Sequence, residues 1–139
     1  MLKTEPIMLI EENSNDVENI LGILKSQNEK HSWFHFRTTA EALEHMENKD
    51  ILPQLIILGL KNRDFESIEF LRKIKADYNL RKIPLVIMAS STDQNHVLES
   101  FNLGVAGYIV KSQDNTELAG IISTMMRYWN LSELPYIEG

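Results

Sequence analysis

Two adjacent carboxylates and a distant lysine are the residues of this sequence whose types suggest chemistry. Glu11 and Glu12 directly follow an apolar run at residues 6–10, and Lys111 directly follows another at residues 106–110. Carboxylates together with bound waters are ligands that Mg²⁺ accepts, so the pair could hold a divalent cation beside the lysine. The same pair could equally be an acidic turn in water, which is the commoner role of two neighbouring loop glutamates.

Whether these side chains meet depends on the central apolar run at residues 52–60, Leu-Pro-Gln-Leu-Ile-Ile-Leu-Gly-Leu. A short apolar run bounded by turn residues is typical of a parallel strand that is buried on both faces. Functional groups of parallel sheets lie beyond the carboxyl ends of the strands, so position 59 is expected to face the site. That position is Gly59, which has no side chain for chemistry.

Five apolar runs alternate with five amphipathic stripes along the chain. The runs lie at residues 6–10, 33–36, 55–60, 83–88 and 106–110, and the stripes begin at Val17, Ala42, Ile68, Val97 and Leu118. Parallel neighbours need crossover connections, so this alternation predicts a doubly wound α/β fold, a parallel sheet between two layers of helices. The loops after the strands would gather seven candidate site residues: Glu11, Glu12, Gly59, Lys61, Ala89, Ser90 and Lys111.

The chain is predicted to form one domain over residues 1–129 with a C-terminal extension over residues 130–139. A length of 139 residues suits a single core, and no internal repeat or linker divides the sequence. The extension is unusually apolar for a chain end, since it carries Leu131, Leu134, Tyr136 and Ile137. These side chains are the basis for expecting a dimer.

Composition argues against several classes of function. The net charge is −6 and the basic residues are scattered, which argues against a nucleic-acid partner. There is no cysteine, so disulfides, thiol catalysis and cysteine-bound metals are excluded. No apolar run is long enough to cross a bilayer, and the first six residues lack the features of a secretory signal. The expected location is cytoplasmic, without a membrane partner.

The span from residue 6 to residue 129 resembles a response-regulator receiver domain of two-component signalling. The segments that carry this resemblance are residues 7–13, 52–58, 73–77, 83–87 and 104–111, in the expected order and spacing. The resemblance implies a flavodoxin-like, five-stranded parallel sheet with strand order 2-1-3-4-5. It also implies a place in phosphorelay signal transduction, although a shared fold does not fix function.

Carried over residue by residue, the resemblance implies an incomplete phosphorylation pocket. The acidic pair that helps to hold Mg²⁺ falls on Glu11 and Glu12, and the lysine falls on Lys111. The phosphoryl-accepting aspartate falls on Gly59, which offers no nucleophile, and the switch hydroxyl falls on Ala89. We therefore expect a pseudo-receiver that is not an enzyme, with weak or absent Mg²⁺ binding. Neighbouring carboxylates repel each other, and Lys111 or Lys61 is expected to replace the metal electrostatically.

The resemblance also implies a surface for protein partners, formed by the fourth helix, the fifth strand and the fifth helix. Its output residues would be Tyr108, the aromatic switch position, and Trp129. Residues 128–129 (Tyr-Trp) and 134–135 (Leu-Pro) are similar to the ends of single-domain regulators that accompany bacterial phytochromes, where the extension contributes to dimer contacts. The expected partner is a histidine kinase or another signalling subunit, with a homodimer through the last helix and tail.

Three functions remain open from the sequence. The first is a stand-alone, phosphorylation-independent receiver that recognises a protein. The second is a phosphorylation-dependent switch that uses another acceptor, such as Asp64, or in which residue 59 has been altered. The third is a small-molecule binding module that admits a ligand above Gly59.

Overall fold

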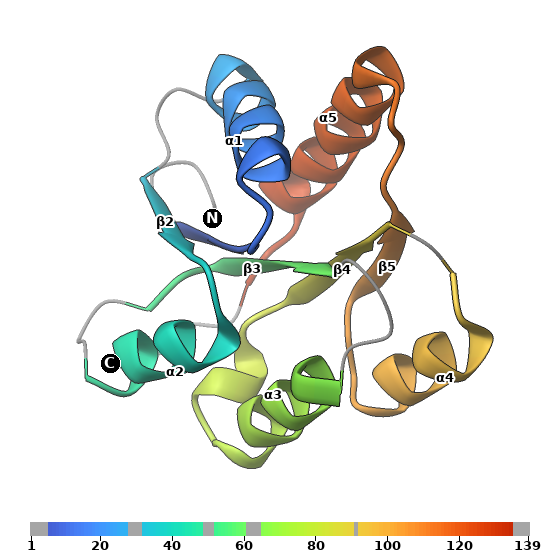
Figure 1. Ribbon diagram of the computed structural model, residues 1–139. Helices are drawn as coiled ribbons and strands as arrows, with labels where there is room; N and C mark the ends of the chain where they lie inside the picture. The colour runs from blue at the N-terminus through green and yellow to red at the C-terminus, as the bar shows by residue number, and fades with distance from the viewer. Residues whose placement is uncertain (1–5, 28–31, 49–51, 61–64, 91, 135–139) are drawn as a thin grey trace.

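Five parallel strands form one sheet in the order β2-β1-β3-β4-β5, with five α-helices around it (Figure 1). The computed structural model describes residues 6–27, 32–48, 52–60, 65–90 and 92–134. The elements are β1 (Ile7–Ile10), α1 (Ser14–Gln27), β2 (Trp33–Phe36), α2 (Thr39–Glu47), β3 (Leu55–Leu60), α3 (Phe65–Ala76), a 3-10 turn at Leu80–Lys82, β4 (Leu85–Ala89), α4 (Gln94–Asn102), β5 (Gly107–Val110) and α5 (Asn115–Leu131). The predicted fold class and strand order are confirmed.

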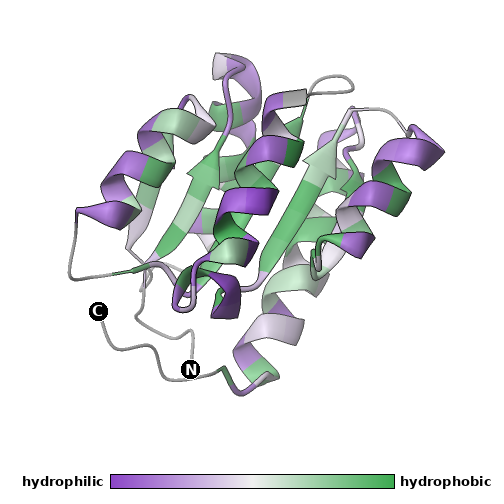
Figure 2. Ribbon diagram, turned by 90° about the horizontal axis from the view of Figure 1, so that it is seen from below, coloured by the Kyte–Doolittle hydropathy of each residue, from purple (hydrophilic) through white to green (hydrophobic). Residues whose placement is uncertain are grey.

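The sheet separates two hydrophobic cores, because successive side chains of a strand point to opposite faces. Helices α1 and α5 cover one face, and α2, α3 and α4 cover the other (Figure 1). In the central strand β3, Leu55 and Ile57 join the core beneath α1 and α5, while Ile56 and Leu58 join the opposite one. Figure 2 shows the strands hydrophobic along their length and the helices hydrophilic on their outer sides. Strand β3 is therefore the buried centre that the sequence predicted.

The register of the strands brings the predicted site loops to one edge of the sheet. Ile10 pairs with Leu58, Leu58 pairs with Ile87, and Ala89 pairs with Val110. Because all strands are parallel, the residues that follow β1, β4 and β5 emerge at the same edge as the end of β3. Glu11 and Lys111 can therefore meet above Gly59 despite their separation in sequence.

Side-chain caps fix the helix starts near this edge. Thr38 is the N-cap of α2, since the Glu41 backbone amide donates to the Thr38 hydroxyl at 3.2 Å. Asp93 caps α4 and Asp114 caps α5 by accepting bonds from the first-turn amides. Helix α5 continues to Leu131 and so crosses the predicted boundary at residue 129. Among the described residues no helix combines the length and apolar character that a membrane span requires.

Helix α4 forms where the sequence predicted it, but it turns a different face to the core. Leu98 and Phe101, two residues of the predicted apolar stripe, are 61% and 51% exposed. The side chains of α4 that are buried are instead polar, His96 and Ser100. An apolar stripe normally faces inward, so α4 carries a hydrophobic outer surface above a polar inner one.

Candidate functional site

The carboxylate of Glu11 lies over Gly59. A Cβ atom added at Gly59 would overlap the Glu11 Oε1 atom, would lie 2.8 Å from the Glu11 Cδ atom, and would lie 3.3 Å from the Ile10 carbonyl oxygen. Glu11 follows β1 and is buried. The glycine therefore does more than remove a nucleophile: its missing side chain leaves the space in which Glu11 is seated.

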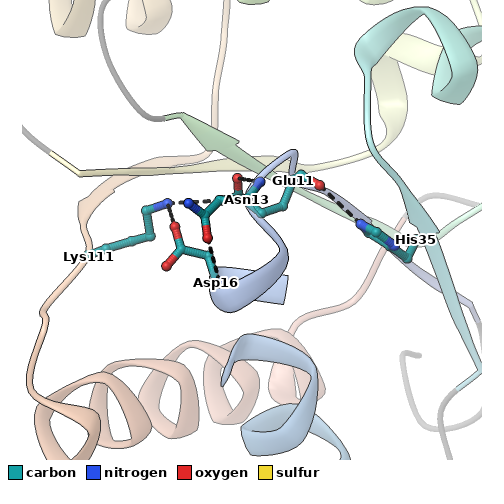
Figure 3. A network of polar contacts seen from close by, with 5 residues as sticks. All are labelled: Glu11, Asn13, Asp16, His35 and Lys111. Atoms are coloured by element: carbon teal, nitrogen blue, oxygen red, sulfur yellow. Dashed lines mark hydrogen bonds and ion pairs between the residues drawn. The ribbon is translucent and has the colours of Figure 1, made fainter. Parts of the chain in front are cut away.

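The Lys111 ammonium holds Glu11 in this place (Figure 3). Its Nζ atom lies 2.9 Å from Glu11 Oε1 and 3.1 Å from Asp16 Oδ2, and its side chain is only 8% exposed. The backbone amide of Asn13 donates to the second carboxylate oxygen of Glu11 at 3.0 Å. Both oxygens of a buried carboxylate are thus satisfied, which such a burial requires.

Asn13 and His35 fix the backbone that carries Glu11 (Figure 3). The Asn13 side-chain oxygen accepts from the Asp16 amide at 3.0 Å, which starts α1 and places the Asp16 carboxylate next to Lys111. The His35 Nε2 atom, from β2, lies 3.1 Å from the Glu11 carbonyl oxygen and can donate to it. The carboxylate therefore extends from an anchored backbone.

The two members of the predicted acidic pair separate in the structure. Glu12 is exposed and lines a different hollow, with His35 and Arg37. The second carboxylate beside Lys111 comes instead from Asp16, which the sequence indicated only as an acidic residue in the first turn of α1. Its position, one helical turn beyond a polar loop at a strand end, is the signal that could have identified it.

The donor set does not fit a divalent cation in this arrangement. Mg²⁺ needs free carboxylate oxygens and waters. Here an ammonium lies between Glu11 and Asp16, and residue 59 supplies no ligand. Within the described ranges no group of three acidic or histidine side chains gathers in a way that could hold a metal ion.

The end of β4 carries Ala89 at the position where the resemblance places the switch hydroxyl. Ala89 is buried, and its carbonyl oxygen accepts the Lys111 amide at 2.6 Å. Ser90 is exposed and its amide donates to the Leu60 carbonyl at 3.0 Å. Lys61 and Asp64, the alternative cation and the alternative acceptor, lie outside the described residues.

Comparison with known proteins identifies the family to which this chain belongs. The sequence model of the family described as response regulator receiver domain matches residues 7–123. The chain belongs to this family. It is therefore a receiver of two-component signalling, as the resemblance predicted.

Several regulators resemble this receiver over most of their length. Response regulator Rcp1 of Synechocystis sp. is 25% identical over 128 residues, which cover 88% of this chain and 87% of Rcp1. The crystal structure of the phosphorylated cyanobacterial phytochrome response regulator RcpA superposes with a TM-score of 0.84 at 28% identity, covering 95% of this chain and 99% of RcpA. The Mn²⁺-bound form of Rcp1 superposes with the same TM-score at 25% identity and the same coverage. The predicted likeness to phytochrome regulators is confirmed.

Tyr108, which the resemblance predicts to be the aromatic switch position, belongs to a second polar cluster that the sequence did not reveal. Its hydroxyl lies 2.8 Å from His96 Nδ1, and His96 Nε2 lies 3.1 Å from the Ser67 hydroxyl. Burial, with a smaller contribution from the Asp93 charge, raises the pKa of the Tyr108 phenol above its ordinary value. The Tyr108 hydroxyl therefore stays neutral and is able to donate a hydrogen bond.

On α5 the exposed aromatic residue is the neighbour of the predicted one. Trp129 is 9% exposed and packs with Met125 and Met126 in the core beneath α5, so it offers little area to a partner. Tyr128 is 61% exposed and stands edge to face against Trp129, with ring centroids 4.8 Å apart. The exposed aromatic side chain on this helix is therefore Tyr128, and an output role for Trp129 stays a prediction.

Proposed function

We propose that this receiver acts by protein–protein recognition, without forming an aspartyl phosphate and without enzymatic activity. The observation that carries the proposal is the seating of the Glu11 carboxylate over Gly59, held by Lys111. In the family pattern this place belongs to the phosphoryl-accepting aspartate and its metal. Here it is filled by side chains that are already paired with one another.

Two further features support a pocket that is closed to phosphoryl chemistry. An incoming phosphoryl group is an anion, and it would meet the buried Glu11 carboxylate where the family needs a cation. The Ala89 methyl group cannot donate a hydrogen bond to phosphoryl oxygens. Lys111 supplies the positive charge that a metal would supply, so Mg²⁺ is expected to bind weakly or not at all.

Incubation with a small phosphodonor and Mg²⁺, followed by intact-mass measurement, tests the proposal. We expect the mass to stay that of the unmodified chain under conditions that phosphorylate an ordinary receiver in a parallel reaction. A stoichiometric phosphoryl adduct at any residue would support the phosphorylation-dependent switch instead. Peptide mapping would then identify the substitute acceptor.

The small-molecule alternative loses its proposed space. The volume above Gly59 contains the Glu11 carboxylate, and the Lys111 side chain adjoins it. A ligand at this place would have to break a buried ion pair. Exposed apolar side chains lie elsewhere, among them Leu98 on α4, Val110 on β5 and Leu131 on α5.

The recognition surface is expected to include an apolar groove between β5 and α5. The groove has a volume of about 870 Å³ and is lined by Val86, Ala106, Gly107, Ile109, Glu117, Gly120, Ile121, Thr124, Met125, Tyr128 and Trp129. Gly120 leaves open space, since a Cβ atom there would meet nothing within 4 Å among the described residues. Tyr128 and the 85% exposed Leu131 project from the same helix.

This pattern of a hollow and a projection on one helix suits a second copy of the chain. A two-fold interface is self-complementary, so each residue meets its counterpart across the axis. If two α5 helices packed antiparallel about Thr124, Tyr128 of each chain would lie opposite Gly120 of the other, because both are four residues from that centre. We therefore propose a homodimer through α5 in addition to a kinase or signalling partner.

Replacing Tyr128 by aspartate tests the dimer. The change places a charge in the proposed apolar contact, and the mass in solution is expected to fall from that of a dimer to that of a monomer. Tyr78→Asp is the matched control, since Tyr78 is 65% exposed and lies outside this surface. Light scattering after size-exclusion chromatography gives the mass. A monomeric parent chain, or an equal effect of both changes, would contradict the proposal.

A further inference from the structure

Helices α3 and α4 and strand β5 are joined by two hydrogen bonds in series, one buried and one partly buried. Ser67 of α3 is fully buried and lies 3.1 Å from His96 Nε2, and His96 of α4 lies 2.8 Å from the Tyr108 hydroxyl on β5. The His96 and Tyr108 rings stand edge to face with centroids 5.6 Å apart. Helices α3 and α4 lie on the same side of the sheet, of which β5 is an edge strand (Figure 1).

The chemistry of the three groups favours one direction of hydrogen bonding. A neutral imidazole donates through one nitrogen and accepts through the other. The Tyr108 hydroxyl is a stronger acid than the serine hydroxyl, so it is the better donor and His96 Nδ1 is the acceptor. The His96 Nε2–H group then donates to the Ser67 oxygen. This assignment uses both ring nitrogens, as a buried imidazole requires.

We propose that Ser67, His96 and Tyr108 form one buried unit that fixes Tyr108, so that the α4–β5 surface is set by helix α3 and not by the pocket above Gly59. This proposal rests on the proposed function. If phosphorylation does not control the recognition surface, the buried unit is what does.

Between described residues, no hydrogen bond joins the Glu11–Lys111–Asp16 network to Tyr108. At the end of β4, where the resemblance places the switch hydroxyl, Ala89 has no side chain that can form a hydrogen bond. The Glu11–Lys111–Asp16 network faces the layer of α1 and α5, whereas Tyr108 packs against the core on the opposite face. Two separate polar networks therefore lie on opposite sides of the sheet.

Fixing Tyr108 also fixes the apolar surface of α4. His96 and Ser100 point inward from α4, and the Ser100 hydroxyl donates back to the His96 carbonyl at 2.7 Å. Leu98 and Phe101 are exposed on the outer side of the same helix, and Val110 at the end of β5 is exposed as well. A rotation of α4 that broke the bond between His96 and Tyr108 would move these apolar side chains. The buried unit thus holds the α4–β5 surface in one arrangement.

Nitration by tetranitromethane, mapped by mass spectrometry, measures how firmly Tyr108 is held. We expect His96→Leu to raise the nitration rate at Tyr108 about fivefold, the factor that corresponds to one net hydrogen bond. Nitration of the exposed Tyr78 and Tyr128 in the same sample serves as the internal reference. Asp16→Asn, which alters only the network around Lys111, is expected to leave the rate at Tyr108 unchanged.

A conservative variant separates positioning from folding. His96→Asn keeps an oxygen near the place of Nδ1 that can accept from Tyr108, but its side chain cannot reach Ser67. The nitration rate at Tyr108 should therefore stay near that of the parent chain. Ser67→Ala should raise the nitration rate at Tyr108 when it is made in the parent chain. It should not raise that rate when it is added to His96→Asn. In the unaltered protein, nitrogen-15 shifts of His96 should report one fixed tautomer with the proton on Nε2.

The proposal is overturned by an averaged tautomer, by an unchanged Tyr108 rate in His96→Leu, or by an Asp16→Asn effect as large as that of His96→Leu. No phosphodonor enters these measurements, so their failure is distinguishable from failure of the proposed function.

Discussion

Replacing Lys111 by methionine is expected to lower the free energy of unfolding by about 3–5 kcal/mol, the usual cost of removing one partner from a buried ion pair. The Lys111 side chain is 8% exposed and that of Glu11 is 3% exposed, so solvent cannot replace the lost ammonium. The Glu11 carboxylate would remain buried with only the Asn13 amide as a hydrogen-bond donor on its carboxylate oxygens among the described contacts. Urea denaturation followed by circular dichroism measures the change.

Two comparisons separate the ion pair from the loss of packing. Lys25→Met removes an exposed lysine from the last turn of α1 and is expected to cost less than about 1 kcal/mol. Adding Glu11→Gln to Lys111→Met removes both buried charges and should recover most of the lost stability, because the carboxylate that Lys111→Met leaves unpaired is replaced by a neutral group. Additive effects of the two changes would show that Glu11 and Lys111 do not interact in solution.

The fold was predictable because its signals extend over the whole chain. Alternation of apolar runs and helical stripes decides between a parallel sheet and its alternatives, and the buried run around Ile56 and Ile57 identifies the central strand. Local capping signals such as Thr38 and Glu41 are equally independent of tertiary structure. The architecture therefore follows from patterns that many residues share.

The candidate site was predictable only in its positions. Glu11, Gly59 and Lys111 meet as their strand ends required, but the seat of Glu11 over Gly59 depends on a side-chain conformation that no sequence pattern encodes. The role of Asp16 was missed for a related reason. An acidic residue in the first turn of a helix is already explained by its favourable interaction with the helix dipole. The ion pair with Lys111 is a second role, and it depends on the tertiary structure.

Helix α4 shows where hydrophobic periodicity fails. Leu98 and Phe101 gave the expected apolar stripe, yet the inner side is formed by His96 and Ser100. Burying a histidine normally costs free energy, and this one is buried because Ser67 and Tyr108 satisfy both ring nitrogens. Those partners are 29 and 12 residues away, so a local pattern could not predict them.

Replacing Gly59 by alanine is expected to lower the free energy of unfolding by roughly 2–3 kcal/mol, although a strand position would ordinarily gain from the change. The new Cβ atom would overlap the Glu11 carboxylate. A mobile glutamate would simply swing aside, but this one is buried and bonded to Lys111 and Asn13. Moving it breaks charge-assisted hydrogen bonds that are worth about 1.5–3 kcal/mol. Chemical denaturation of the variant provides the measurement.

Gly107→Ala is the matched control for this change. Gly107 lies in β5, and a Cβ atom there would make only ordinary contacts with Val86 at 3.8 and 3.9 Å, so little stability should be lost. Removing the obstructing side chain with Glu11→Ala should abolish the penalty of Gly59→Ala, giving a strongly non-additive pair. Equal effects of the two glycine changes would contradict the seating of Glu11. If the penalty is present, Gly59→Asp meets the same obstruction, so restoring the acceptor by itself is not expected to restore phosphorylation.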